Sequence, residues 1–311
     1  MTDVVLPEAA GQALRETAAE ARVLVIGSLN VDLILNVDSE PPDEGAVLVR
    51  KATTDVGGHA GNCASALAAL GMSVSLVAAV GTDADGDLLL ADLLRRGVDV
   101  SGVRRYEQEP TGRVVIPVFG EKHYMLLSRG ANELLTASDV QDAALRQDFD
   151  AVMLFDPSRE VLREIEHVTA KMASAPILCW TPGGIYSRDP VAEQVVPHCD
   201  VLFLNRAEHG DLAGRLPAIE SDALRPELVL TSGERGSALR HRGSEWAVPA
   251  RRVPVVDPTG AGDAFSAAYL LARLAGLEPV QRLAVANASG ALAVGAVGAR
   301  GRLARLPDLV P

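Results

Sequence analysis

Short apolar runs of strand length alternate with segments of helical periodicity along this chain, and this alternation most limits what it can fold into. Strands that alternate with helices form parallel sheets, because each helix carries the chain back to the edge where the next strand begins. We predict strands at 22–26, 74–80, 103–106, 151–155, 177–180 and 201–204, and helices at 63–70, 85–96, 160–172 and 191–196. The pattern indicates an α/β fold: a mostly parallel central sheet with helices on both faces.

A glycine-rich segment at 256–265, VDPTGAGDAF, runs directly into an apolar helical segment. We predict that a strand over 253–256 leads into it. The first backbone N–H groups of a helix lack partners within the helix, and the helix dipole places positive charge behind them. Gly260 and Gly262 would let an anion such as phosphate approach these groups closely. The segment is therefore a candidate anion site.

Asp263 lies at the start of that predicted helix, and two interpretations of it are open. A carboxylate at this place is commonly a helix cap or a first-turn acid that the dipole stabilises. The glycines and the hydroxyl group of Thr259 favour a second role, in which the carboxylate accepts a proton from a hydroxyl group that attacks the bound anion.

Charge and lysine content exclude several classes of phosphate-binding protein. The net charge is −12 with no basic run, so a broad nucleic-acid surface is not expected. None of the lysines, Lys51, Lys122 and Lys171, follows a glycine, so the phosphate loop that ends in Gly-Lys-Ser/Thr is absent. Any phosphate must be held locally.

Cysteine content and the uncharged stretch at 56–82 bear on the compartment. Cys63, Cys179 and Cys199 are too few for a disulfide framework, so we expect a cytoplasmic protein. Glycines interrupt the uncharged stretch, which argues against a membrane span of about 20 apolar residues.

Four further strands stand apart from the main alternation. Runs at 33–37 and 46–49 flank a turn-rich segment, and runs at 113–119 and 123–127 form a hairpin. We expect them to build one small sheet, a lid with strands within 33–53 and 112–128. Residues 1–21 are predicted to be a helical N-terminal extension, and 22–311 one large domain.

The segment DPTGAGD at 257–263 resembles the signature of the ribokinase, or PfkB-type, family of carbohydrate and nucleoside kinases. GGHAGN at 57–62 resembles the family's first signature, and NRAE at 205–208 resembles its N-x-x-E motif. The resemblance runs from about Arg22 to the C-terminus. It implies a ribokinase-like three-layer sandwich with a β lid over the sugar, ATP and Mg²⁺ as cofactors, K⁺ as a further candidate, and a homodimer formed through the lid.

The resemblance also implies a role for individual residues. Asp263 matches the general base, and the backbone of Gly260, Ala261 and Gly262 matches the site that holds the transferring phosphoryl group. The expected sugar-binding residues are Asn30, Asp32, Gly57, Gly58, His59, Asn62, Asp156 and Asp263, of which Asp156 stands where ribokinase-like proteins usually carry a glutamate. Those matching the nucleotide site are Asn205, Glu208, Thr231, Gly233, Gly236, Gly260, Gly262 and Asn287, with Glu208 acting near magnesium. Those matching a monovalent cation site are Asp257, Thr259, Ala293 and Gly298.

Two of these assignments have alternatives. Asn205 with a glutamate three residues later is also the ordinary pair of a helix capping box. Arg302 stands near the position where a small hydroxyl residue often completes the cation site, which leaves that cation open.

The expected activity is ATP-dependent transfer of the γ-phosphoryl group to a hydroxyl group of a sugar, without nucleic-acid or membrane partners. The hydroxyl-binding groups favour a sugar, although His59 stands where ribokinase itself usually has lysine. A nucleoside kinase is the alternative, with Phe119 and Tyr124 as candidate walls for a base. A catalytically silent sugar- or nucleotide-binding regulator is a third possibility, because a fold alone does not assign chemistry.

Overall fold

The computed structural model describes residues 6–40, 44–120, 122–220 and 225–310. Within them the largest sheet has eight strands in the order β15-β14-β13-β12-β11-β10-β1-β4. Six neighbouring strands, β13, β12, β11, β10, β1 and β4, run parallel to one another. Strands β14 and β15 add an antiparallel edge that the sequence pattern did not predict. The strands are β1 (Arg22–Gly27), β4 (Ser73–Val77), β10 (Ala151–Phe155), β11 (Ile177–Thr181), β12 (Val201–Asn205), β13 (Glu227–Thr231), β14 (Ser237–His241) and β15 (Ser244–Val248).

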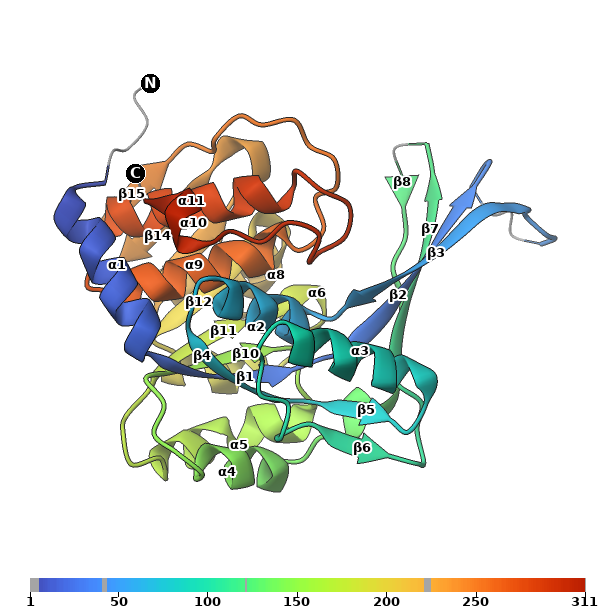
Figure 1. Cartoon of the computed structure of the whole chain (residues 1–311), viewed down its shortest axis with the longest axis horizontal. Coiled ribbons are helices and arrows are strands. Elements are labelled where there is room, and N and C mark those ends of the chain that lie inside the picture. The colour runs from blue at the N-terminus through green and yellow to red at the C-terminus, as the bar shows by residue number, and fades with distance from the viewer. Residues whose placement is uncertain (1–5, 41–43, 121, 221–224, 311) are drawn as a thin grey trace.

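Successive strand residues point to opposite sides of a sheet, so an apolar strand makes both faces apolar. Helices cover both faces of this sheet and bury them. In β1, Val23 and Val25 pack into one buried cluster, and Leu24 and Ile26 pack into another. Figure 1 shows α1, α2, α9 and α10 above the sheet and α4 and α5 below it. The predicted three-layer α/β architecture is confirmed.

The helices, listed in chain order, include several that the pattern did not predict. They are α1 (Glu8–Glu20), α2 (His59–Ala69), α3 (Ala84–Arg95), α4 (Ala137–Ala144), α5 (Arg159–Ala170), α6 (Gly183–Tyr186), α7 (Ala192–Val195), α8 (Arg206–Arg215), α9 (Ala261–Leu274), α10 (Pro279–Ala293) and α11 (Leu306–Leu309). Short 3-10 turns are η1 (Gly130–Leu134), η2 (Val196–His198), η3 (Pro217–Glu220) and η4 (Gly233–Arg235).

The lid is a separate sheet that extends from one side of the molecule (Figure 1). Its described strands are β2 (Asn30–Val37), β3 (Val49–Gly57), β7 (Gly112–Phe119), β8 (Lys122–His123) and β9 (Leu126–Ser128). The predicted strand at 46–49 is wrong in its bounds, because β3 begins at Val49. From there β3 pairs with β2 along its length, as far as Gly57 opposite Asn30. These two ends of β2 and β3 lie at the edge of the main sheet.

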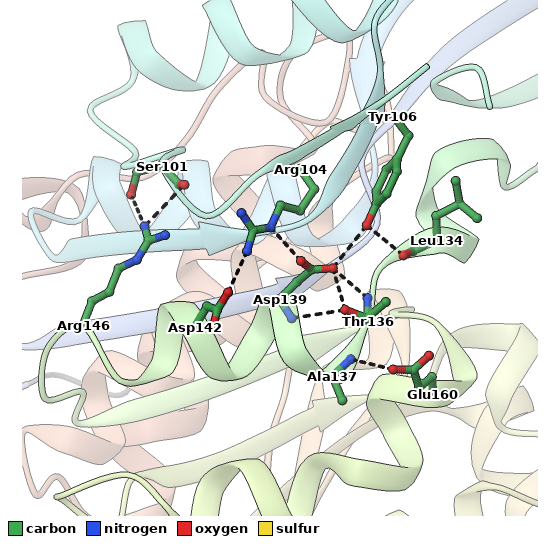
Figure 2. A network of polar contacts seen from close by, with 10 residues as sticks. All are labelled: Ser101, Arg104, Tyr106, Leu134, Thr136, Ala137, Asp139, Asp142, Arg146 and Glu160. Atoms are coloured by element: carbon green, nitrogen blue, oxygen red, sulfur yellow. Dashed lines mark hydrogen bonds and ion pairs between the residues drawn. The ribbon is translucent and has the colours of Figure 1, made fainter. Parts of the chain in front are cut away.

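The apolar run at 74–80 forms two strands rather than the single one predicted. β4 joins the main sheet, whereas β5 (Ala79–Gly81) pairs with β6 (Arg104–Tyr106) in a two-stranded sheet. Figure 2 shows how β6 is attached to α4: Arg104 Nε donates to Asp139 Oδ1 at 2.7 Å and the Tyr106 hydroxyl donates to Asp139 Oδ2 at 3.2 Å. Both halves of the run are buried, so the apolar pattern alone could not separate them.

Asp83 connects the two-stranded β5–β6 sheet to the lid. The Asp83 carboxylate caps α3 by accepting from Gly86 N at 2.9 Å, and it also accepts from Thr111 N at 2.8 Å and Thr111 Oγ1 at 2.6 Å. Thr111 directly precedes β7. The segment at 81–86 is therefore structural, and it fixes the base of the lid.

The strand predicted at 253–256 is not formed. Val255 and Val256 are 64% and 58% exposed, and Val256 N donates to Val294 O at 2.8 Å rather than to a neighbouring strand. Pro254 has no N–H to offer to a strand ladder, so this apolar segment remains an extended loop.

The N-terminal helix is part of the main core. Leu14 and Ala18 of α1 are fully or almost fully buried in the same cluster as Tyr269 and Leu270 of α9. The segment predicted to be helical contains α1 over Glu8–Glu20, and Met1 to Val5 lie outside the described residues. In the described part of the chain, no helix has the length and apolarity needed to cross a membrane. Cys63, Cys179 and Cys199 are free and buried.

Candidate active site

The carboxyl ends of the parallel strands meet at one edge of the sheet, where open α/β folds bind ligands. Asp156 follows β10 at this edge, 8% exposed and with a left-handed backbone at φ 48°. Its Oδ2 lies 3.0 Å from His59 Nδ1, whereas its Oδ1 is buried without a hydrogen-bond partner. A left-handed backbone and a buried carboxylate oxygen without a protein partner make Asp156 a candidate ligand-binding residue.

The glycines at the start of α2 make room for this site. Gly58 has φ 87°, and a Cβ there would lie 2.7 Å from Asn30 N. A Cβ on Gly57 would collide with the carboxylate of Asp32. The pair of glycines therefore brings β2, β3 and the start of α2 together, as close approach of backbones requires.

Asp32 is a buried carboxylate at the base of the lid, 9% exposed and directly opposite Asp55 across the β2–β3 pair. Burial and the like charge of Asp55 raise the pKa of Asp32 to about 6. Asn30 lies on the same strand, and its Oδ1 accepts from Asn132 Nδ2 at 3.0 Å.

Asp263 is the third residue of α9 but does not cap it. The N-cap is Gly260, in the left-handed conformation and without a side-chain cap. Asp263 is instead 7% exposed and its Oδ2 accepts from Asn62 Nδ2 at 2.9 Å. Burial raises the pKa of Asp263, while His59 and Asn62 oppose the rise. The side chain faces Asn62 on α2 and does not cap the helix, although Asp263 does lie in the first turn of α9, where the helix dipole stabilises a carboxylate.

His59 is the cation of this acidic site, and its side chain is 48% exposed. Burial of the ring by itself would lower its pKa, but the negative charges of Asp263 and Asp156, together with Glu208, raise the pKa of His59 to about 10. The surrounding carboxylates therefore favour the protonated imidazole, which carries donors at both ring nitrogens.

A cavity of about 790 Å³ lies on the other side of the α9 N-terminus. Gly262 and Ala261 line it, and a Cβ built on Gly262 meets no atom within 4 Å. The predicted nucleotide residues Thr231, Gly233, Gly236 and Asn287 also line it, and three arginines, Arg235, Arg251 and Arg252, contribute positive charge. A polyanion would fit this lining.

Asn287 has a structural part in the cavity wall. Its Nδ2 donates to Val248 O at 3.1 Å and its Oδ1 accepts from Ser237 Oγ at 2.9 Å. The amide is thus used to hold α10 against β14 and β15, although the residue still borders the cavity.

Asn205 and Glu208 form a helix capping box, which was one of the two interpretations of this pair from the sequence. Asn205 Oδ1 accepts from Ala207 N and Glu208 N at 2.9 and 3.0 Å, and Glu208 Oε2 accepts from Asn205 N at 2.9 Å. Burial raises the pKa of Glu208, although the Asn205 N–H and His59 oppose this. The box places the Glu208 carboxylate close enough to His59 for their charges to interact.

Asp257 joins the loop before α9 to the loop after α10. Its Oδ1 accepts from Thr259 N at 2.9 Å and Thr259 Oγ1 at 2.6 Å, and its Oδ2 accepts from Gly298 N at 2.9 Å. Burial by itself would raise the pKa of Asp257, but these hydrogen bonds lower it. Both oxygens already serve protein donors, and Ala293 ends α10 just before this loop.

Two residues that the sequence analysis missed hold parts of the predicted sugar site in place. Asn132, 3% exposed, accepts from Leu29 N at 2.9 Å and donates to Leu29 O at 3.0 Å. Arg300, 5% exposed, donates to Asn62 Oδ1 at 3.0 Å. Neither belongs to a recognisable motif; an arginine within the small-residue run at 295–301 was the only local signal.

Comparison with known proteins identifies relatives along almost the whole chain. The family model of pfkB family carbohydrate kinases matches residues 20–304. An ATP-dependent ribose-1-phosphate kinase from Halopiger xanaduensis is 31% identical over 281 residues, which are 90% of this chain and 94% of the relative.

Two solved structures share the fold. The ribokinase of Thermotoga maritima matches with a TM-score of 0.82 and 22% identity, over 93% of this chain and 98% of its own. The nucleoside kinase of Methanocaldococcus jannaschii, described as an archaeal member of the ribokinase family, matches with a TM-score of 0.81 and 22% identity, over 94% and 97%.

Proposed function

The chain belongs to the pfkB family of carbohydrate kinases, and from this premise we propose that it transfers the γ-phosphoryl group of ATP to a hydroxyl group of a sugar, with Asp263 as the general base. The observation that carries the proposal is that the cavity and the Asn62 side of the site meet at the start of α9. Gly262 faces the large cavity, while the next residue, Asp263, faces Asn62 on the sugar side. Donor and acceptor would therefore meet at one helix N-terminus.

The chemistry follows from this placement. The backbone N–H groups of the first turn of α9 and its dipole would stabilise the charge of the transferring phosphoryl group. The Asp263 carboxylate would take the proton of the attacking hydroxyl, and its raised pKa brings it nearer to the operating pH. Phosphoryl transfer needs little more from a protein than such positioning and electrostatic stabilisation.

Magnesium would enter with the nucleotide. Among the described residues no group of three or more His, Cys, Asp or Glu side chains could hold a metal alone, which fits an ion bound mainly by phosphates and water. Glu208 would hold it through water from its place in the capping box. When bound, Mg²⁺ neutralises charge on the phosphates. We assign no step to K⁺, because both Asp257 oxygens are committed to Thr259 and Gly298.

A sugar is the favoured acceptor, and Asn30, Asp32, Asn62 and Asp156 are the proposed ligands of its hydroxyl groups. The unpartnered Asp156 Oδ1 supports this, since a buried carboxylate oxygen requires a donor. A nucleoside is the second candidate. It is favoured by the lid pair Phe119 and Tyr124, whose ring centroids lie 5.3 Å apart and could cover a base.

The test is a coupled ATPase assay with magnesium and a panel of pentoses, hexoses, sugar acids, ribose 1-phosphate and nucleosides. A sugar-dependent turnover of about 1 s⁻¹ or more is expected. Turnover with nucleosides alone would replace the sugar by the second candidate. If ATP and a sugar bind by calorimetry but no acceptor is phosphorylated, the chain is a silent binding protein and the proposal fails.

We also propose a homodimer formed through the lid and a cytoplasmic location. The exposed lid residues Leu48, Met125, Leu126 and Leu127 support the first, since they are 66%, 58%, 59% and 49% exposed. The three free cysteines support the second.

A further inference from the structure

Arg300 is a buried cation in the loop that follows α10. Its side chain is 1% exposed, and each of its three guanidinium nitrogens has a partner on a different element. Nε donates to Asn62 Oδ1 on α2 at 3.0 Å. One terminal nitrogen donates to Asp92 Oδ2 on α3 at 2.9 Å, and the other to Gly57 O at the end of β3 at 2.8 Å.

The surrounding sequence accommodates this side chain. A Cβ on Gly61 would collide with the guanidinium, so a larger residue there would displace Arg300 from its present position. Asp92 is 6% exposed and supplies the opposite charge; burial alone would raise its pKa, but Arg96 and Arg300 lower it. The ion pair is thus complete before any ligand arrives, and Arg300 is unlike the exposed arginines of the nucleotide cavity.

Donor chemistry fixes the orientation of Asn62. A guanidinium has only donors, so Asn62 must turn its amide oxygen towards Arg300. The amide NH₂ group then faces the other way, where it donates to Asp263 Oδ2 at 2.9 Å. One carboxylate oxygen of Asp263 is therefore occupied, and the other is left for the acceptor hydroxyl.

We propose that Arg300 is a positioning residue for the acceptor site, which holds the Asn62 amide in the orientation that presents its NH₂ group to Asp263. The inference rests on the proposed function, since Asp263 acts there as the base. The guanidinium nitrogens of Arg300 bind Asn62, Asp92 and Gly57, so we expect no direct contact between Arg300 and the acceptor. Its effect passes through Asn62, and its loop also packs on the start of α9, where Gly260 has no room for a Cβ beside Ala299.

The test is a double-mutant cycle of Arg300→Lys and Asn62→Ala, measured as kcat and KM at saturating ATP with the acceptor found in the panel. Lysine keeps the charge but loses the planar fork that reaches three partners. We expect Arg300→Lys to lower kcat about 10- to 100-fold, the size of effect that misplaced reacting groups produce, with an unchanged KM for ATP. In the Asn62→Ala background the same substitution should have no further effect on kcat.

Arg96→Lys is the matched control. Arg96 Nε donates to the same Asp92 oxygen at 2.9 Å, but from the outer side, with its side chain 30% exposed. A residue that matters only for the Asp92 ion pair would affect kcat equally in both lysine variants. Equal losses, or an Arg300→Lys effect of the same size with and without Asn62, would overturn the proposal.

Two further measurements keep the outcome decisive. If Arg300→Lys does not fold, the pair Arg300→Met and Asp92→Leu replaces the buried ion pair by apolar groups, and the same coupling with Asn62 is expected. A crystal structure of the folded variant is independent of activity: Asn62 Nδ2 should move out of hydrogen-bond distance from Asp263. If that contact persists, the proposal is wrong. If the wild-type protein phosphorylates no acceptor, the proposed function fails while the crystal structure still decides the role of Arg300.

Discussion

Asp263 and Asp32 are both buried carboxylates, and burial acts on them in the same direction: each is harder to ionise than an aspartate in water. They differ in their neighbours. His59 and Arg300 oppose the rise in pKa at both carboxylates, but Asp263 also accepts from the Asn62 amide, whereas Asp32 lies directly opposite Asp55. Both proposed site residues therefore carry charges that cost stability in the free protein.

We expect Asp263→Asn to lower kcat by at least about 100-fold, because an amide cannot accept the proton of the attacking hydroxyl. Asparagine has the same shape, so the melting temperature, ATP binding and sugar binding should hardly change. The assay is coupled ADP production, with a mock purification to exclude host kinases. Near wild-type turnover would show that Asp263 is not the base.

Asp32→Asn should stabilise the free protein at neutral pH. The pKa of Asp32 in the folded protein is about 6, above the ordinary value of 3.8. Between these two pH values the folded state therefore holds a proton that the unfolded chain has lost. Stability therefore falls as pH rises through this window, and the full cost, of the order of 2–3 kcal/mol, is present above pH 6.

Urea unfolding at pH 8 and at about pH 4, in the same salt, measures the effect. The gain in the free energy of unfolding should be largest at pH 8 and should shrink towards pH 4. Sugar binding should weaken while ATP binding is retained, because only the sugar is proposed to contact Asp32. A variant less stable than wild type at pH 8 would contradict this account.

At the scale of elements, α9 separates the two halves of the site. Its first turn is open at Gly262 to the cavity proposed for the nucleotide, while its body is buried against α2 and α10 from Ala264 to Ala272. The helix can therefore present an anion site without moving, because its interior residues are fixed by the core.

Gly262→Ala separates stability from activity on this helix. The added Cβ meets no protein atom within 4 Å, and alanine favours a helix over glycine by up to about 1 kcal/mol. We expect an equal or higher melting temperature together with a clear loss of kcat, because the methyl group enters the phosphoryl path.

Gly214→Ala on α8 is the matched control for this substitution, since its Cβ also meets no atom within 4 Å. It should change the melting temperature similarly but leave kcat unaltered. If Gly262→Ala keeps full activity, the phosphoryl group does not pass at that position.

The whole molecule has two parts that meet at the site: the layered sandwich and the lid. The lid strands are anchored at the sandwich edge, and the lid exposes apolar residues, among them Leu126 on β9 and Met125 just before it. A thin sheet cannot cover such residues by itself, so an apolar surface and open strand edges remain for a partner.

We expect the protein to be a dimer in light scattering at micromolar concentration. Leu126→Lys on the lid should shift it to a monomer, because a charge would be buried in the interface. Leu94→Lys on α3 is the control: Leu94 is 58% exposed, close to the 59% of Leu126, but lies outside the lid. A monomeric wild-type protein, with and without sugar, would rule out the dimer.

The sequence by itself determined the architecture and the motif residues of the site. Strand-length apolar runs that alternate with helical periodicity predicted the layered α/β fold, because period and length are local properties of the chain. The DPTGAGD segment placed Gly262 and Asp263 at a helix start, and the structure has them there. The same local information could not decide whether Asp263 caps the helix or faces Asn62, since that depends on α2, about 200 positions away.

Only the tertiary structure decided the contacts between distant segments. The run at 74–80 forms two strands because its first part pairs with β1 and its second part with β6. Residues 253–256 form a loop, in which Val256 N donates to Val294 O rather than to a neighbouring strand. Arg300 reaches Asn62 across 238 positions of sequence. Its role follows from three donors meeting three acceptors in a buried place, and such a meeting has no periodicity or motif in the chain.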